Sequence, residues 1–281
     1  MNIHSFKPQN PVLKNYVEFY YFLKSENPEF NAKYFAFPNV TTPLSIHKNV
    51  RTEIKAYSTS VFAGQVSNYA ALVQGMRKQP LSVNLKGKID KVTIIFKPLG
   101  LNHFIEKSFA EITPRDSQLF EEWNNNIDYA EFLGNFYAAD GRVERVGLLE
   151  NFLLSVYKLR ENQTVLEKAI EVLTDFNDEK TIDEISRQLN LNVRTFNRMF
   201  RNEVGISPAG FRKIARFRHS LESKIFNKQF QRLTDLAYQS NYYDQAYFIK
   251  IYRKMTGANP TNFFTSIEKL ADDKIIFKFI R

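Results

Sequence analysis

Two stretches of this chain share one pattern, and the repeat constrains the fold more than any other feature of the sequence. The stretches are FNRMFRNEVGISP (196–208) and FIKIYRKMTGANP (248–260). In each, an aromatic residue comes first, a second aromatic follows four residues later, Gly nine residues later and Pro twelve residues later. The copies are offset by 52 residues, from Gly205 to Gly257. This shared spacing indicates two copies of one small structural unit.

The first copy is preceded by a short segment with a clear helix start. TIDEISRQLN (181–190) opens on Thr181, and Glu184 three residues later completes a capping box, which satisfies free amides at a helix N-terminus. Asn190 ends the segment, and Asn tolerates the left-handed conformation that a tight turn requires. Asn192 can cap a second helix directly afterwards. The pattern therefore predicts two short helices joined by a tight turn.

The second of these helices has one apolar and one polar face. Phe196, Met199 and Phe200 recur at helical spacing and are predicted to point into the core. Gly205 suits the residue after the helix, and Pro208 suits the first turn of the next one. The predicted outer stripe consists of Arg194, Asn197, Arg198 and Arg201. Two short helices with such a stripe on the second predict a helix-turn-helix, whose second helix enters the major groove of DNA.

The second copy repeats this arrangement. RLTDLAYQSN (232–241) provides the first helix and ends on Asn241 at the turn, after which Asp244 can cap the second helix. Phe248 and Tyr252 are predicted to face inward. The predicted outer face holds Gln245, Ala246, Ile249 and Lys250, with Arg253 and Lys254 further along.

The segment between the copies, 208–226, is predicted to be one long helix because its apolar residues follow the helical period. About sixteen residues of helix span ~24 Å, at roughly 1.5 Å per residue. Neighbouring major-groove faces on one side of DNA lie about 34 Å apart. A rigid helix of this length, together with the radii of two small helical bundles, would let both units enter successive major grooves.

Positive charge is concentrated where the repeat lies. The chain has a formal net charge of +9, and residues 181–264 contain fourteen Lys or Arg against six Asp or Glu, a local balance of +8. A basic third on a near-neutral remainder indicates a polyanionic partner such as double-stranded DNA. On charge alone, a basic surface that is merely solvated remains the alternative.

The first part of the chain has a different character. Runs such as LSVNL (81–85) and KVTIIF (91–96), with frequent Pro and Gly, predict a β-rich region over residues 1–100. The segment 16–24 fits a strand or a helix equally well. A helix is expected over 145–159, and it could pair with its twin in a dimer or pack within the monomer.

In the repeated motifs the chain resembles the AraC/XylS family of bacterial transcription regulators. The resemblance covers roughly residues 165–266 and is most specific in AYQSNYYDQAYFIKIYRKMTGANPTNFF (237–264). Asn190 and Asn241 stand where the family usually has Gly, and Tyr252 where Phe is commoner. Because Asn is the best substitute for Gly in a left-handed turn, the family fold is still expected.

The resemblance implies an α+β fold. A β-rich N-terminal domain, a cupin-like barrel with helices, would sense a ligand or mediate dimerisation, and an all-α domain would hold two helix-turn-helix units joined by a long helix. The expected boundaries are 1–160 for the first domain, which is β-rich over 1–100 and helical over 101–160, then 161–270 for the second and 271–281 for a C-terminal tail. A helix over 164–176 is expected to open on Thr164 as its N-cap.

The leading hypothesis is a sequence-specific transcription regulator that inserts two recognition helices into successive major grooves. The resemblance implies that it activates transcription, through contacts with RNA polymerase. The residues expected to read base edges are Arg194, Asn197, Arg198, Gln245, Ala246, Ile249 and Lys250. Those expected to contact phosphates are Asn192, Thr195, Arg201, Arg253 and Lys254. A small-molecule effector and a homodimer stay open, and the effector-binding residues are unknown.

Two other classes of function are weighed against this hypothesis. An enzyme fused to the DNA-binding module would need a catalytic group, but the absence of cysteine excludes the repair methyltransferases that carry such a module. The isolated histidines His47 and His103 form no catalytic motif. A ligand-independent or non-specific architectural DNA-binding protein would need charge without base-reading side chains, and Arg194, Asn197 and Gln245 argue against it.

Composition bears on cofactors and location as well. With no cysteine and four scattered histidines, neither a metal centre nor another cofactor is expected. The N-terminus lacks a signal-peptide pattern, and no run of eighteen apolar residues is present, so we expect a cytoplasmic protein with no membrane partner.

Overall fold

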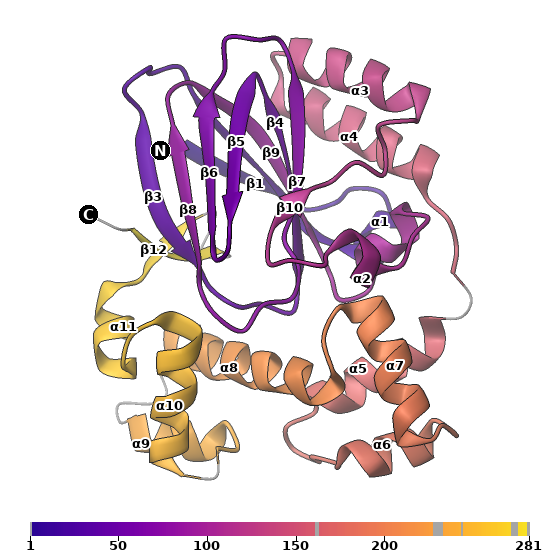
Figure 1. Ribbon diagram of the computed structural model, residues 1–281, viewed down its shortest axis with the longest axis vertical. Coiled ribbons are helices and arrows are strands. Elements are labelled where there is room, and N and C mark those ends of the chain that lie inside the picture. Colours follow the sequence, from indigo (N-terminus) through magenta and orange to yellow (C-terminus); the bar gives the residue numbers. More distant parts are fainter. Residues whose placement is uncertain (1, 161–162, 227–232, 243, 271–274, 280–281) are drawn as a thin grey trace.

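The computed structural model of the protein describes residues 2–160, 163–226, 233–242, 244–270 and 275–279. A β-rich N-terminal half occupies one end of the molecule and a helical C-terminal half the other (Figure 1). The fold class predicted from the sequence is thereby confirmed.

The N-terminal half is built on two six-stranded sheets in the described chain, and the sheets face each other. The first sheet, in spatial order, contains β1 (Asn2–Phe6), β2 (Val17–Ser25), β9 (Ile89–Phe96), β4 (Thr42–Lys48), β7 (Tyr69–Val73) and β10 (Gln118–Leu119). The second contains β11 (Glu268–Leu270), β12 (Ile275–Phe279), β3 (Asn31–Ala36), β8 (Leu81–Lys86), β6 (Ser58–Ala63) and β5 (Val50–Lys55). Most neighbouring strands run antiparallel, whereas β6 and β8 are parallel.

The two sheets enclose an apolar interior, as expected for a cupin-like barrel. Leu81, Val83 and Leu85 alternate along β8 and are buried there, because successive side chains of a strand point to opposite faces. Leu23 of β2 reaches the same cluster from the opposite sheet. The segment 16–24, which fitted either type of structure, therefore belongs mainly to a strand.

Short and long helices cover the outer face of the first sheet. They are α1 (Leu13–Tyr16), the 3₁₀ helix η1 (Gly100–Phe104), α2 (Phe109–Ile112), α3 (Ile127–Ala138) and α4 (Arg142–Val156). Phe132 of α3 and Phe152 of α4 stack with their ring centroids 4.6 Å apart.

The helix predicted over 145–159 is α4, and it lies three residues earlier than expected. Leu159 falls beyond its end and is 68% exposed, so the expected end of the helix at residue 159 is wrong. Leu149 and Leu153 are buried in the core of the N-terminal half. Of the two alternatives for this helix, packing within the monomer is the one that its buried face supports.

The C-terminal half consists of helices. They are α5 (Thr164–Thr174), α6 (Ile182–Gln188), α7 (Val193–Val204), α8 (Pro208–Phe226), α9 (Leu233–Gln239), α10 (Gln245–Thr256) and α11 (Pro260–Ser266). The prediction that Thr164 caps α5 is wrong, because Gln163 before it is already in a helical conformation and Thr164 is the first residue of the helix.

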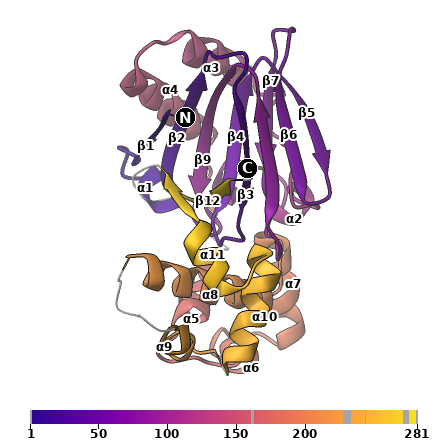
Figure 2. The same cartoon turned by 90° about the vertical axis from the view of Figure 1, so that its left-hand side faces the viewer.

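The two halves share a core and a sheet. Phe37 and Leu99 of the N-terminal half are buried in the apolar cluster of the C-terminal helices, and the Phe37 ring packs edge-on against Phe263 of α11 with centroids 4.9 Å apart. The segment expected to form a tail, 271–281, contributes β12, which runs antiparallel to β3 with Lys278 opposite Phe35. Figure 2 shows β12 beside β3, directly above α11. Residues 271–274 and 280–281 of the expected tail lie outside the described residues.

Candidate DNA interface

The first helix-turn-helix unit, α6 and α7, has the caps and the turn that its sequence predicts. Thr181 and Glu184 form the capping box of α6. Asn190 adopts the left-handed conformation in the turn, with φ 55°. The Asn192 side chain accepts a hydrogen bond of 2.8 Å from the Thr195 amide and so caps α7. Gly205 ends α7 with φ 79°.

The second unit, α9 and α10, has a turn, a helix cap and a helix end of the same kinds. Asn241 stands in the turn with φ 53°, and Gly257 ends α10 with φ 76°. Asp244 accepts a hydrogen bond of 2.6 Å from the Tyr247 amide at the start of α10. The left-handed Asn190 and Asn241 explain why both units tolerate Asn where the family usually has Gly.

The repeated aromatics pack the second helix of each unit, α7 or α10, against the connecting helix α8. Phe200 of α7 packs edge-on against Phe211 of α8, with ring centroids 5.5 Å apart. Tyr252 of α10 packs edge-on against Phe217, further along α8, at 5.1 Å. The buried Tyr252 hydroxyl forms a hydrogen bond of 2.8 Å with Ser220 Oγ. This partner accounts for Tyr at a position where Phe is commoner, because a buried hydroxyl without a hydrogen bond is costly.

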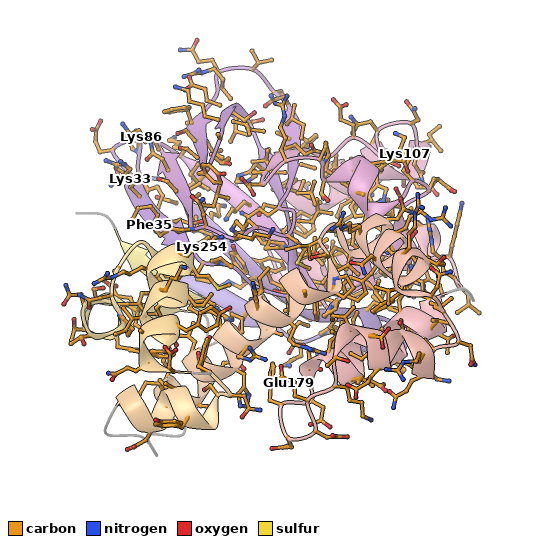
Figure 3. All side chains as sticks on the ribbon, turned by 60° about the horizontal axis from the view of Figure 1, so that its bottom comes forward. Lys33, Phe35, Lys86, Lys107, Glu179 and Lys254 are labelled. Atoms are coloured by element: carbon orange, nitrogen blue, oxygen red, sulfur yellow. The ribbon has the colours of Figure 1, made fainter. Side chains whose placement is uncertain are left out.

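The connecting helix is held in place by ion pairs as well as by its apolar face. Glu179, in the segment between α5 and α6, pairs with Arg216 and lies 3.8 Å from Arg212 Nε, both on α8. Figure 3 shows Glu179 beneath α8, with α7 and α10 at either end of that helix. These contacts join the first unit to α8, so the connecting helix is part of a packed frame.

The outer face of α7 carries three exposed arginines, Arg194, Arg198 and Arg201. Within the described residues, none of the three guanidinium groups forms an ion pair. Asn197 is half-buried, and its Nδ2 donates a hydrogen bond of 2.9 Å to the Val193 carbonyl, one turn earlier in the same helix. Free arginine groups on one helix face suit phosphate oxygens and guanine edges.

The outer face of α10 is also exposed at most of the predicted positions, which are Gln245, Ala246, Lys250, Arg253 and Lys254. Ile249 differs, because it is half-buried and packs against the core of the C-terminal half. The prediction that Ile249 faces fully outward is therefore wrong, and only part of its side chain is available at the surface. Its position beside the buried Phe248 puts it at the edge between the two faces of the helix.

A cleft of about 1560 Å³ runs along the outer face of α7. One wall is α7 itself, including Arg194, Asn197 and Arg198. The opposite wall comes from the N-terminal half and the connection to α5, with Glu106 and Arg160 among its residues. The three residues of the first unit that were assigned to base edges thus lie together in one hollow.

The two histidines considered for catalysis sit in structural positions. His47 is buried between the sheets; burial, and then the neighbouring charge of Lys91, lower its pKa. His103 packs against the Tyr16 ring at 4.1 Å between centroids, and its Nδ1 lies 3.0 Å from the Lys158 carbonyl. Among the residues that the structure describes, no three His, Asp or Glu side chains gather as metal ligands.

A search of the described helices for one long and apolar enough to cross a membrane found none.

The two halves of the chain match different family models. Residues 185–266 match a family model described as a helix-turn-helix domain, and residues 4–118 match a domain of unknown function, DUF6597. The uncharacterized HTH-type transcriptional regulator YtdP of Bacillus subtilis is 28% identical over 89 residues, which are 32% of this chain and 11% of that protein. The chain thus spans about a tenth of the length of this curated relative.

Two solved structures of ToxT from Vibrio cholerae are distantly similar. One is 14% identical with a TM-score of 0.42, over 94% of this chain and 97% of that chain. The other, a ToxT with bound unsaturated fatty acid, is 13% identical with a TM-score of 0.39, over 93% of each chain. The helix-turn-helix match begins within α6 and runs to the end of α11, so it includes both turns and the buried aromatics described above. Residues 185–266 therefore form a helix-turn-helix domain of the AraC type, the kind of domain with which transcription regulators bind DNA.

Proposed function

We propose that the protein is a sequence-specific regulator that reads two different DNA boxes, one with α7 and one with α10. The observation that carries this proposal is the duplication itself. Two units with matching turns and a side-chain cap on each second helix are fixed to separate aromatic positions on one helix, and each presents an exposed, cationic outer face. The faces differ in sequence, so a single chain would recognise a non-palindromic site.

The length of α8 supports insertion into successive major grooves. The helix has 19 residues, which corresponds to about 28 Å at ~1.5 Å per residue. Adjacent grooves on one side of DNA lie about 34 Å apart, and the widths of the two units add to the reach of the helix. The contacts of Glu179 with α8 stiffen this spacing.

We assign the outer residues to two roles. The proposed base-reading residues are Arg194, Asn197, Arg198, Gln245, Ala246, Ile249 and Lys250. Arg and Gln can form paired hydrogen bonds with guanine and adenine edges, and Ala246 and the exposed part of Ile249 suit thymine methyl groups. Asn197 would exchange its hydrogen bond with the Val193 carbonyl for one with a base.

The proposed phosphate contacts are Asn192, Thr195, Arg201, Arg253 and Lys254. Arg201, Arg253 and Lys254 lie toward the C-terminal ends of α7 and α10, where the DNA backbone is nearer than the bases. Asn192 and Thr195 lie at the N-terminus of α7, where amide groups and the helix dipole favour an anion.

The remaining parts of the proposal concern regulation. We assign sensing or dimerisation to the β-rich domain, residues 1–160, and DNA binding to residues 161–270. The regulator would work in the cytoplasm as an activator that contacts RNA polymerase. A reporter driven by the bound promoter tests the sign, because an activator raises its output and a repressor lowers it.

A spacing experiment tests the two-groove model. Genomic fragments bound by the full-length protein are selected, and the protected site is mapped by footprinting. Five base pairs are then inserted between the two boxes, which turns one box to the opposite face of the duplex. The control is the same insertion outside the boxes.

We expect the insertion between the boxes to lower cognate binding to the level of a duplex with one intact box and the outside insertion to leave it unchanged, because α8 cannot follow the rotation. Undiminished binding to the interrupted site would refute reading by both units together. Equal affinity for the selected site and for random DNA of the same length and salt would instead identify a non-specific architectural protein.

A further inference from the structure

The C-terminal end of α7 is capped by a residue of the N-terminal half. Asn102 of η1 is 1% exposed, and its Nδ2 donates hydrogen bonds to the Glu203 backbone oxygen at 2.9 Å and to Glu203 Oε2 at 3.0 Å. The last carbonyl groups of a helix have no partner within the helix. Asn102 therefore provides, from another part of the chain, a donor that the first reading helix lacks at its end.

A second contact lies one step further along the same helix end. Gly205 follows α7 with φ 79°, and a Cβ added there would lie 2.9 Å from Phe109 Cε1. Phe109 is 2% exposed and belongs to the core of the N-terminal half. It begins α2, whose N-terminus is fixed by the capping box of Ser108 and Glu111. Figure 1 shows α2 directly above the end of α7.

The glycine at the matching end of α10 has different surroundings in the described structure. Gly257 has nearly the same conformation as Gly205, with φ 76°, but a Cβ added at Gly257 would meet nothing within 4 Å. The two units therefore differ in one respect that their sequence repeat hides. Asn102 and Phe109 of the N-terminal half lie against the end of α7, whereas a Cβ at Gly257 has no comparable neighbour in the described structure.

The 3₁₀ helix η1, which carries Asn102, is connected directly to β9 of the first sheet. Gly100, the first residue of η1, lies four residues after the end of β9, and a Cβ on it would lie 2.2 Å from the Tyr16 carbonyl oxygen. The Lys97 amide donates to the same oxygen at 2.8 Å. At the other side of η1, His103 contacts the Lys158 carbonyl in the connection to α5. A shift of β9 or α1 would thus move η1, and Asn102 with it.

We propose that Asn102 is a positioning residue for DNA reading, which holds the last turn of α7 against the N-terminal half and thereby sets how Arg194 and Arg198 meet the first box. This role rests on the proposed function of α7. It makes reading of the first box responsive to the position of η1, since the hydrogen bonds of the Asn102 side chain go to α7.

The test is the substitution Asn102→Asp in the full-length protein. Aspartate is nearly the same size but replaces the donor by an anionic acceptor, which faces the Glu203 carbonyl and carboxylate. The matched control is Asn125→Asp, which makes the same charge change at an exposed site of the N-terminal half. The rescue variant is Asn102→Asp with Glu203→Gln, in which the new amide can donate to the new carboxylate.

Binding is measured on two duplexes, one with only the first box intact and one with only the second. We expect Asn102→Asp to weaken first-box binding about tenfold, a size typical of coupling between sites, and to leave second-box binding unchanged. Asn125→Asp should match the wild type on both, and Glu203→Gln should restore part of the loss. Hydrogen exchange provides a readout without DNA: amides at the end of α7 should exchange faster in Asn102→Asp, and those at the end of α10 should not.

Each outcome separates this inference from the proposed function. If the wild type does not distinguish the boxes from random DNA, the proposed function fails, and the exchange data still decide whether Asn102 holds α7. If the wild type reads both boxes and Asn102→Asp behaves identically in both assays, the positioning role is refuted. An equal loss on both boxes together with a lower thermal midpoint would show a general folding role and would also overturn it.

Discussion

Gly205 and Gly257 can be compared directly as substitution sites, because they occupy the same place in two copies of one motif. Both adopt the left-handed conformation after a reading helix, with φ 79° and 76°. They differ in surroundings: a Cβ at Gly205 would lie 2.9 Å and 3.0 Å from two carbons of the Phe109 ring, whereas a Cβ at Gly257 would meet nothing within 4 Å. Replacing each glycine by alanine therefore separates backbone strain from steric conflict with the N-terminal half.

The magnitudes follow from these two terms. A left-handed conformation costs a residue with a Cβ about 1–2 kcal/mol relative to Gly, and Gly257→Ala should lower the free energy of unfolding by that amount alone. Gly205→Ala has the same strain and in addition pushes a methyl group into Phe109, which is buried and cannot swing away. Overpacking of this kind costs about 1–3 kcal/mol. The total for Gly205→Ala is thus roughly 2–5 kcal/mol.

The assay is urea unfolding of the full-length variants, followed by far-ultraviolet circular dichroism. A further variant combines Gly205→Ala with Phe109→Leu, and its effect is compared with that of Phe109→Leu alone. In that background the alanine should cost less than in the wild type, because leucine lacks the Cε1 atom that lies nearest to the added methyl group. Equal losses for Gly205→Ala and Gly257→Ala in the wild-type background would refute the contact between α7 and the N-terminal half.

Three further predictions concern charge. Arg194→Ala should weaken binding to the cognate site by about 1–3 kcal/mol and affect random DNA little; equal losses in a side-by-side titration would mark it as a phosphate contact only. Removing Arg201, Arg253 or Lys254 should weaken cognate and random DNA alike and reduce the slope of log affinity against log salt by about one, so an unchanged slope contradicts the assignment. Burial lowers the pKa of His47 below 6.5, so it is neutral when folded and stability should fall as the pH drops below about 6.5, by up to ~1.4 kcal/mol per pH unit; unfolding curves of His47→Gln should lack that component.

What could be predicted from the sequence was local. The capping box at Thr181, the cap at Asn192 and the left-handed turns at Asn190 and Asn241 depend on residues a few positions apart, and each has the predicted form. The inward aromatics were predictable for the same reason, since helical period alone places Phe200 on the inner face.

The contacts that could not be predicted from the sequence join residues that are far apart in the chain. Nothing near Tyr252 indicates that Ser220, on another helix, will satisfy its hydroxyl. The grip of Asn102 on α7 joins residues about a hundred positions apart, and neither residue type signals it. The predicted exposure of Ile249 was wrong for a different reason. Each helical residue turns about 100°, so a position at the border between two faces is assigned by small differences in packing.

Although the two units share one sequence pattern, their helices have different neighbours in the structure. In each, the spacing of aromatic, Gly and Pro builds the same helix pair, so the differences arise where neighbours differ. Tyr252 forms a hydrogen bond with Ser220 on α8, and a Cβ on Gly257 after α10 would meet nothing within 4 Å. The end of α7 meets Asn102 and a buried ring instead. Because α8 fixes the distance between the units, a signal from the N-terminal half cannot easily change the spacing of the boxes. Under the positioning role proposed for Asn102, η1 would instead tilt α7, and the first box would be a point at which regulation acts.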